Sequence, residues 1–226
     1  MKKLIMIAAM MVATLSASAQ FEPGTFSLQP KLGMNLSKVS NMPPIGYGKY
    51  TIDRSLLVGG AVGVEAEYQI AKPFSVAAAL LFSMQGCQWE DTKLKNAGPK
   101  GEDIQIKDAK IELNYASIPV VANIYLFKGF AIKGGVQFGF LASANAKSSA
   151  KMGDVTKTAD SDVKSSFNKF DLSIPVGISY QVPNIPIYID SRAIFGVTDI
   201  EKDVEDGDKN SRNQVFQLTV GYKFAL

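Results

Sequence analysis

The sequence predicts an all-β fold: an eight-stranded antiparallel up-and-down transmembrane β-barrel. Apolar residues alternate with polar or small ones in eight segments, the last of which is residues 216–226. An apolar closing strand needs a partner, because its unpaired backbone groups would otherwise template aggregation. Pairing it with the first strand closes a barrel. The connections also alternate between long and short, as they do in outer-membrane barrels with short periplasmic turns.

The N-terminal segment has the pattern of a secretory signal peptide. Two lysines precede an apolar run at residues 4–15, and a small-residue cleavage site ends at Ala19. The run is too short for a transmembrane helix, which needs about 20 apolar residues. We therefore expect residues 1–19 to be the signal peptide and residues 20–226 to be the outer-membrane β-barrel domain.

Charge and cysteine content restrict the function further. The chain has 24 basic and 21 acidic residues, and two of the lysines lie in the expected leader, so the remainder is nearly neutral. This composition gives no reason to expect a nucleic-acid partner. The single cysteine, Cys87, excludes an internal disulfide. An exported chain must then be held by other means, and a closed hydrogen-bonded barrel provides them.

Four strands are expected in the first half of the barrel domain: residues 26–37, 56–70, 74–85 and 111–126. Long connections, 38–54 and 86–108, separate the first from the second and the third from the fourth. The fourth strand changes the phase of its apolar residues between Tyr115 and Ile118. Beside Pro119, such a change predicts a β-bulge.

Four more strands follow, at residues 130–143, 170–181, 187–197 and 216–226. Tight turns at 128–129 and 183–186 alternate with long loops at 146–168 and 199–212. Three prolines, Pro30, Pro119 and Pro175, fall inside strands that have no free edge in a closed barrel. Because proline cannot donate to a ladder, we expect bulges or locally open pairs there.

Alternation alone does not decide which face meets lipid. In a lipocalin-like soluble barrel, the alternative, the apolar residues would point inward. The other face here is mostly Gly, Ala, Ser and Gln, which is typical of a crowded barrel interior. The apolar face is therefore assigned to lipid. Trp89 and Tyr115 are assigned to the outer aromatic girdle rather than to a sugar-stacking platform.

Charged residues on the inward phase form the main candidate site. They lie about three to five residues from the strand ends nearest a short turn or a terminus, and so occupy one layer in the lower half of the barrel. The set is Lys31, Glu65, Glu67, Lys133, Asp190, Arg192 and Lys223. We expect an internal ionic plug in which Arg192 and Lys31 bridge to Glu65, Glu67 or Asp190. The alternative is that each charge is hydrated separately.

Short motifs suggest a family. Two strands share Ser-Ile-Pro-Val, at residues 117–120 and 173–176, and Asp-Ser-Arg at 190–192 leads into Phe-Gly-Val-Thr-Asp-Ile at 195–200. With Gly-Tyr-Lys-Phe at 221–224, the chain resembles the PorT-like outer-membrane β-barrel family over nearly all of the barrel domain. The resemblance implies this fold and an outer-membrane location.

The end of the closing strand is the candidate signal for the barrel-assembly machinery. Its residues are Tyr222, Phe224 and Leu226. The sequence departs from the usual bacterial barrel signal because it ends in Leu226, with the aromatic Phe224 two residues earlier.

The residue types present argue against an enzyme. The chain has no histidine, which excludes Ser-His-Asp and Cys-His hydrolysis and metal sites built on histidine. We expect no catalytic residues, no metal and no cofactor. The acidic segment 199–208 could hold calcium through carboxylate oxygens, but it lacks EF-hand spacing, so a solvated loop is favoured. Cys87 is interpreted as a small residue near a strand end rather than a reactive thiol.

Two classes of function remain. One is a structural or interaction protein whose side-chain-filled barrel presents its long loops, and the other is a narrow porin-like channel for small solutes or ions. Eight strands enclose an interior just wide enough for side chains, which favours the first. The expected partners are outer-membrane lipid, the barrel-assembly machinery and an unidentified loop-binding partner. We expect a monomer.

Overall fold

The computed structural model describes residues 22–42, 44–47, 50–97, 102–127, 129–152, 155–202 and 210–226. The expected signal peptide, residues 1–19, lies outside the described residues. Within the described part of the chain, no helix is long and apolar enough to cross a membrane.

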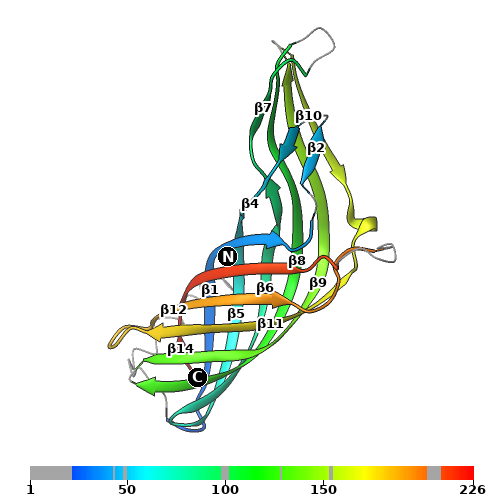
Figure 1. Ribbon diagram of the computed structural model, residues 1–226. Coiled ribbons are helices and arrows are strands. Elements are labelled where there is room, and N and C mark those ends of the chain that lie inside the picture. Colours follow the sequence, from blue (N-terminus) through cyan, green and yellow to red (C-terminus); the bar gives the residue numbers. More distant parts are fainter. Residues whose placement is uncertain are drawn as a thin grey trace, which may run out of the picture.

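Eight strands close a barrel, which confirms the predicted fold (Figure 1). They are β1 (Phe26–Val39), β5 (Leu57–Ala71), β6 (Phe74–Trp89), β8 (Ile104–Phe127), β9 (Phe130–Met152), β11 (Phe170–Gln181), β12 (Ile187–Gly196) and β13 (Asn213–Tyr222). Each pairs antiparallel with the next. β13 then pairs with β1, with Leu218 opposite Met34, and so completes the ring.

The two faces of the wall differ as the sequence predicts. Outward residues are apolar and exposed; Leu32 is 68% exposed and Leu80 62%. Inward residues of the same strands are polar and buried, such as Gln29 and Glu65. A soluble barrel would reverse this arrangement, so the alternative of an inward apolar face is wrong.

Each of the three prolines within strands lies where the pairing on one side of its strand is interrupted. The pairing of β1 with the last strand breaks at Pro30, that of β6 with β8 at Pro119, and that of β9 with β11 at Pro175. On the other side the register continues, opposite Val64, Gln137 and Ile194 respectively. The expected locally open pairs are confirmed, and each strand keeps one intact neighbour.

The predicted bulge beside Pro119 is wrong. In β8, Leu113, Tyr115 and Ser117 are all buried while Ile118 is exposed, so the inward phase never changes. The nearest register shift lies before Pro119, between Asn114 and Tyr115, where the pairing passes over Ala142 of β9. The apolar residues change sides because the barrel interior itself becomes apolar at that level.

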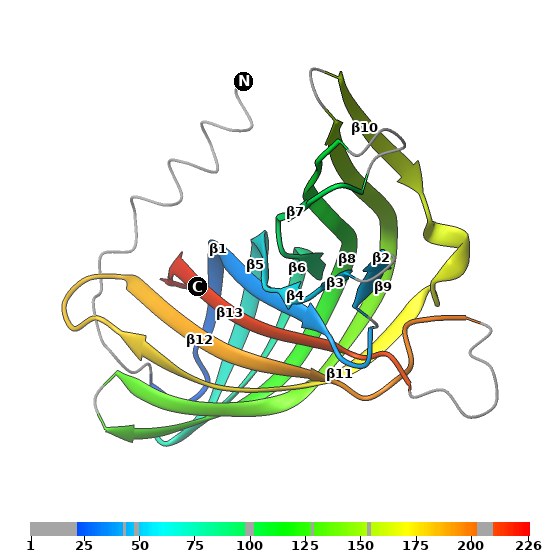
Figure 2. The ribbon, with the colours of Figure 1, turned by 45° about the horizontal axis from the view of Figure 1, so that its top comes forward.

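Two expected loops, 86–108 and 146–168, are largely strand. β6, β8 and β9 run on past the expected boundaries, and β7 (Thr92–Leu94) and β10 (Val155–Asp162) pair with the outer ends of β8 and β9. The resulting four-stranded sheet stands beyond one end of the barrel (Figures 1 and 2). We call it the protruding sheet: β7, β10, residues 104–112 of β8 and residues 145–152 of β9.

The other connections also contain regular structure. The expected loop 38–54 holds the hairpin of β2 (Ile45–Tyr47) and β3 (Tyr50–Ile52), and it ends at β4 (Arg54–Ser55), which pairs with β6. A 3₁₀ turn, η1 (Lys164–Ser166), follows β10. All of these lie on the side of the barrel from which the protruding sheet rises.

The predicted alternation to the last residue fails after Tyr222. Lys223 interrupts the strand, and β14 (Phe224–Ala225) pairs only with β1. Phe224 is 8% exposed and its ring centroid lies 4.3 Å from that of Tyr222. Leu226 is 77% exposed, and its N–H donates to the Phe26 carbonyl at 2.8 Å. Phe224 therefore adds little to the lipid-facing surface.

Candidate functional site

The barrel interior is the candidate site, and it is filled at three levels. Charged side chains lie nearest the short turns, neutral amides and hydroxyls lie above them, and apolar side chains fill the end below the protruding sheet. We call the charged level the ionic layer and the apolar level the mouth core.

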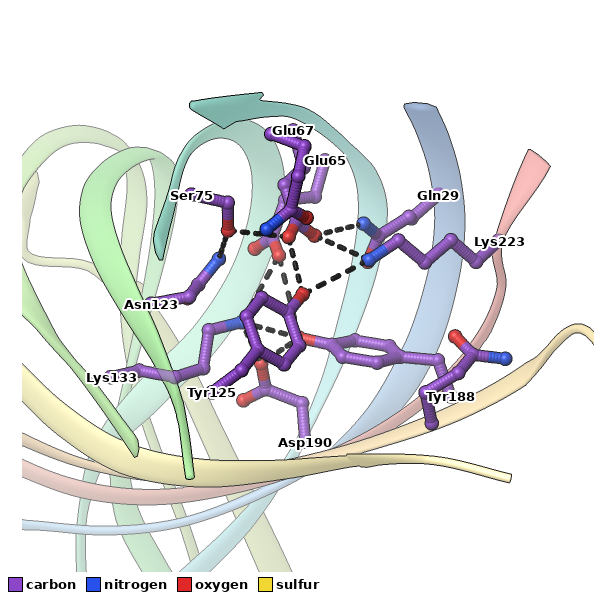
Figure 3. A network of polar contacts seen from close by, with 12 residues as sticks. Gln29, Glu65, Glu67, Ser75, Asn123, Tyr125, Lys133, Tyr188, Asp190 and Lys223 are labelled. Carbon is purple, nitrogen blue, oxygen red and sulfur yellow. Dashed lines mark hydrogen bonds and ion pairs between the residues drawn. The ribbon is translucent and has the colours of Figure 1, made fainter. Parts of the chain in front are cut away.

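The structure places all seven predicted charged residues inside the barrel. Figure 3 shows Glu65, Glu67, Lys133, Asp190 and Lys223 among their polar partners. They project from four wall strands, β1, β5, β9 and β12, and from the residue between β13 and β14. Their exposed fractions are 2% for Lys31, 0% for Glu65, 2% for Glu67, 6% for Lys133, 0% for Asp190, 1% for Arg192 and 5% for Lys223.

Glu65 is the centre of the larger group. Its carboxylate accepts from Lys31 Nζ at 2.5 Å, from Arg192 Nη2 at 2.6 Å and from Lys133 Nζ at 3.2 Å. Asp190 lies beside it and accepts from Arg192 Nε and Nη2, both at 2.7 Å, and from Lys133 Nζ at 2.6 Å. Two carboxylates thus hold three cations across four strands.

Glu67 is the centre of a smaller group. It accepts from Lys223 Nζ at 2.8 Å and from Gln29 Nε2 at 2.7 Å. The hydroxyls of Ser75 and Tyr125 also donate to it. Lys31 and Arg192 both contact Glu65, and Lys223 is the cation on Glu67.

Two tyrosines complete the ionic layer, and the sequence analysis did not assign them to it. The Tyr188 hydroxyl donates to Asp190 and accepts from Lys133, whose Nζ lies 5.0 Å from the ring centroid. Likewise, the Tyr125 hydroxyl donates to Glu67 and accepts from Lys223. Both tyrosines lie on the inward phase of their strands, two residues from a polar inward residue. The inward phase could therefore have identified them from the sequence.

This arrangement satisfies buried charge at close range. The Glu65 group has three cations and two carboxylates, and the Glu67 group has one of each. Removing one partner of a buried pair costs about 3–5 kcal/mol, because the remaining charge is left without compensation. The layer therefore fixes the positions of the strands that contribute to it.

Neutral side chains fill the next level. Asn35 Nδ2 donates to Ser83 Oγ at 3.0 Å and to the Met84 carbonyl at 2.8 Å. Gln217 Nε2 donates to Asn35 Oδ1 at 3.0 Å, which links β13 to β1. These amides cross the interior without carrying charge, and they separate the ionic layer from the apolar end.

The mouth core is built partly from outside the wall strands. Its buried members are Val39, Met42, Ile52, Cys87, Trp89, Ala109, Leu113, Tyr115, Leu141, Ala144, Phe167 and Ile200. Met42, Ile52, Phe167 and Ile200 come from the connections, which fold over the barrel end.

The mouth core corrects the assignment of two aromatics. Trp89 is 7% and Tyr115 1% exposed, so neither belongs to an outer girdle. Cys87 is 1% exposed and packs within the mouth core, so its thiol is shielded from solvent.

Metal chemistry finds no support among the described residues, where no group of three or more His, Cys, Asp or Glu side chains could hold an ion. Most of the acidic segment 199–208 that was considered for calcium, residues 203–208, lies outside the described part of the chain.

Comparison with known proteins gives a family match. The model of a family described as "Outer membrane protein beta-barrel domain" matches residues 18–202. A search of curated proteins found none that matches the chain.

Several solved structures are similar. Ail, the attachment invasion locus protein of Yersinia pestis, is 13% identical with a TM-score of 0.42, over 89% of this chain and 99% of that one. OprG from Pseudomonas aeruginosa is 13% identical with a TM-score of 0.40, over 92% and 99%. Neisserial surface protein A is 13% identical with a TM-score of 0.39, over 88% and 97%.

Proposed function

Because the chain belongs to the outer membrane protein beta-barrel domain family, we propose that it is a closed scaffold of the outer membrane that presents its protruding sheet to a binding partner. We also propose that the protein belongs to a PorT-like subfamily and is exported with a signal peptide that is cleaved after Ala19. The barrel-assembly machinery would insert it by recognising Tyr222, Phe224 and Leu226, and the inserted protein would be a monomer. Mass spectrometry of the mature N-terminus tests the cleavage site.

The filled interior is the observation that carries this proposal. An eight-stranded barrel has room for little more than its own side chains. Here the ionic layer and the mouth core fill two levels of that space, and neutral amides fill the level between them. A side-chain-filled lumen supports a scaffold over a channel, and it supports the expectation that the ionic layer acts as a plug.

The protruding sheet is the part best placed for recognition. All eight residues of β10 are exposed, and β7 and β10 are the edges of the sheet. The connections 38–54 and 199–212 contribute Ile52, Ile200 and other residues to the mouth core instead. Binding residues commonly lie on segments that a rigid scaffold positions, and the protruding sheet fits that description. A non-enzymatic role is part of the proposal, and the absence of histidine from the whole chain supports it.

Two hairpin replacements test the proposal. The backbone N–H of Val163 donates to the Ala144 carbonyl at 3.0 Å, so a two-residue turn in place of 146–161 leaves the barrel and the mouth core intact. Gln88 lies opposite Lys110, and a short turn can likewise replace 90–108. Partner capture from outer membranes should be lost while the heat-modifiable barrel band on gels is retained. Capture that survives both replacements would rule the proposal out.

A narrow channel is the competing function, and one observation favours it. Four buried polar atoms on β12 and β13 have no hydrogen-bond partner among the described residues: Arg192 Nη1, Asn213 Oδ1, Gln217 Oε1 and Thr219 Oγ1. Water could occupy this part of the lumen. Single-channel recording in planar bilayers separates the two functions, because a plugged scaffold gives no unitary conductance. Arg192→Ala should lower thermal stability in detergent and admit a small leak current.

The orientation is also a proposal, with both termini periplasmic and the protruding sheet outside the cell. An even number of strands places both ends on one side, and short turns belong to the periplasm. Trypsin added to intact cells should cut within the lysine-containing segment 147–164. Cleavage only after permeabilisation would invert the orientation.

A further inference from the structure

On the outer surface, basic residues follow the last apolar outward residues of β1, of β13 and of the segment that leads into β5. On β1 the outward residue after Leu36 is Lys38, and on β13 the outward phase runs from Phe216 through Gln214 to Arg212. Arg54 on β4 precedes the outward Leu56, which lies between β4 and the wall strand β5. Lys38 lies opposite Gln214 in the register, and Arg212, whose carbonyl accepts from the Ser40 N–H at 2.9 Å, lies one outward position beyond it on the neighbouring strand. We call Lys38, Arg54 and Arg212 the basic rim.

The basic rim surrounds two adjoining hollows. A cavity of about 590 Å³ is lined by Lys38, Arg54 and Leu56, among others. A second cavity, of about 400 Å³, is lined by Arg212 and Phe195. Both cavities share Ser40, Asn41 and Gln214 in their linings. The three cations therefore face one compound hollow, whose apolar margin is formed by Leu56 and Phe195, 52% and 50% exposed.

The basic rim is not neutralised by the described part of the chain. None of its three side chains takes part in an ion pair there, and no acidic residue is among those lining either cavity. The protruding sheet is different, because its cations find carboxylates: Lys93 with Asp103 at 2.9 Å, and Lys110 and Lys147 with Glu112 at 2.8 and 2.7 Å.

We propose that the basic rim binds the phosphate of a lipid headgroup in the leaflet that meets this end of the barrel. The position fits this ligand, since cations beyond the apolar end of a barrel wall lie where headgroup phosphates lie. Arg54 and Arg212 offer guanidinium groups suited to paired hydrogen bonds with phosphate, and Lys38 adds a point charge between them. Acyl chains attached to the same headgroup would run down the wall past Leu56 and Phe195. Cations that only reached into water would not need to face a shared hollow.

Lipid titration of the purified, folded mature protein tests this site. Lipid A carrying two phosphates, and the same lipid with both phosphates removed, are added in mild detergent and followed by native mass spectrometry. We expect preferential retention of the phosphorylated lipid. Each of Lys38→Gln, Arg54→Gln and Arg212→Gln should weaken binding about fivefold, and the triple variant about a hundredfold, from the usual contribution of one basic residue near a charged membrane surface.

A matched triple variant is the control. Lys72→Gln, Lys107→Gln and Lys157→Gln together remove the same charge from exposed positions that line neither cavity, and retention should not change. Equal retention of dephosphorylated lipid, an equal loss in the control triple, or pyrophosphate competing as strongly as the lipid would each overturn the assignment. The purified system contains no loop partner, so the result is independent of the hairpin replacements. Heat-modifiability verifies folding of every variant.

Discussion

The ionic layer and the mouth core fill the same barrel by opposite means. In the ionic layer, seven charged side chains from the wall form close pairs, with Glu65 alone accepting from three cations. In the mouth core, apolar side chains from the wall and from the connections pack together with no charge among them. The comparison teaches that one β-barrel can close its lumen with directional electrostatics at one end and with hydrophobic burial at the other.

The two levels should respond differently to substitution. Charge pairs depend on each partner and on net charge, so one neutral substitution leaves several groups uncompensated. Apolar packing loses only the contacts of the atoms removed, together with the cost of the cavity left behind. Single substitutions that keep the shape of the side chain therefore test whether the two levels differ in this way.

The largest effect is expected for Glu65→Gln. The substitution keeps the side-chain shape but leaves Lys31, Lys133 and Arg192 facing Asp190 alone, and it should destabilise the barrel by about 3–5 kcal/mol. Urea unfolding in lipid vesicles measures the change. Glu67→Gln is the comparison and should cost less, because it leaves only Lys223 without its carboxylate partner at 2.8 Å. Adding Lys31→Met to Glu65→Gln should recover part of the loss. If Glu65→Gln and Glu67→Gln lower the stability equally, Glu65 is not the centre of the charge network.

Leu113→Ala tests the mouth core. Leu113 is fully buried, and truncation should cost about 2–4 kcal/mol through lost burial and a residual cavity. The same change at the lipid-facing Leu80, which is 62% exposed, should cost much less. Because the ionic layer below is untouched, Leu113→Ala should admit no leak current in planar bilayers. A leak current would show that the mouth core, rather than the ionic layer, holds the lumen closed.

The ionic layer was predictable from the sequence because it obeys one rule. Six of the seven charged residues of the layer lie on the inward phase of a wall strand, and the same phase assigns the outer apolar face. The pairing pattern was only partly accessible: Lys223 follows the last residue of β13, and its contact with Glu67 depends on how the chain departs from a regular strand there. Tyr125 and Tyr188 follow the same rule and could have been included.

The mouth core and the protruding sheet were not predictable in the same way. Leu113 and Tyr115 point inward although the wall rule assigns apolar residues to lipid, so their phase was taken for a bulge. Met42, Ile52, Phe167 and Ile200 come from connections and follow no period. In β10 every residue is exposed, and polar residues on both faces remove the alternation that reveals a strand.

A smaller effect is expected for Tyr188→Phe. The Tyr188 hydroxyl donates to Asp190 and accepts from Lys133, so its removal leaves both charged groups with one contact fewer while the ion pair between them remains. The expected loss is about 1–3 kcal/mol, less than for Glu65→Gln, measured by the same urea unfolding. Tyr180→Phe, on the lipid-facing side of β11 and 38% exposed, is the matched control. If both variants lose the same stability, the hydroxyl of Tyr188 is not part of the network.

The smallest effect concerns an ion pair outside the barrel wall, in the protruding sheet. Partial burial opposes ionisation of Glu112, but hydrogen bonds from Lys110 and Lys147 hold the pKa of its carboxyl below the usual value. A lowered folded-state pKa means that the contribution to stability is present above the unfolded pKa of about 4.3 and is lost as pH falls through the folded value. Lys147 is 37% exposed, so solvent screening limits the contribution to under about 1 kcal/mol.

Hydrogen exchange resolves an effect of this size. Protection factors of the amides in residues 110–112 and 145–147 should fall between pH 5 and pH 3, while those of wall-strand amides beside the ionic layer stay constant, since their charge pairs are buried deep within the barrel. Glu112→Gln should remove the pH dependence. Asp160→Asn, which changes the residue opposite Lys147 in the register of β9 with β10, should leave most of it in place. A fall in protection that persists in Glu112→Gln would assign the acid sensitivity to another carboxylate of the protruding sheet.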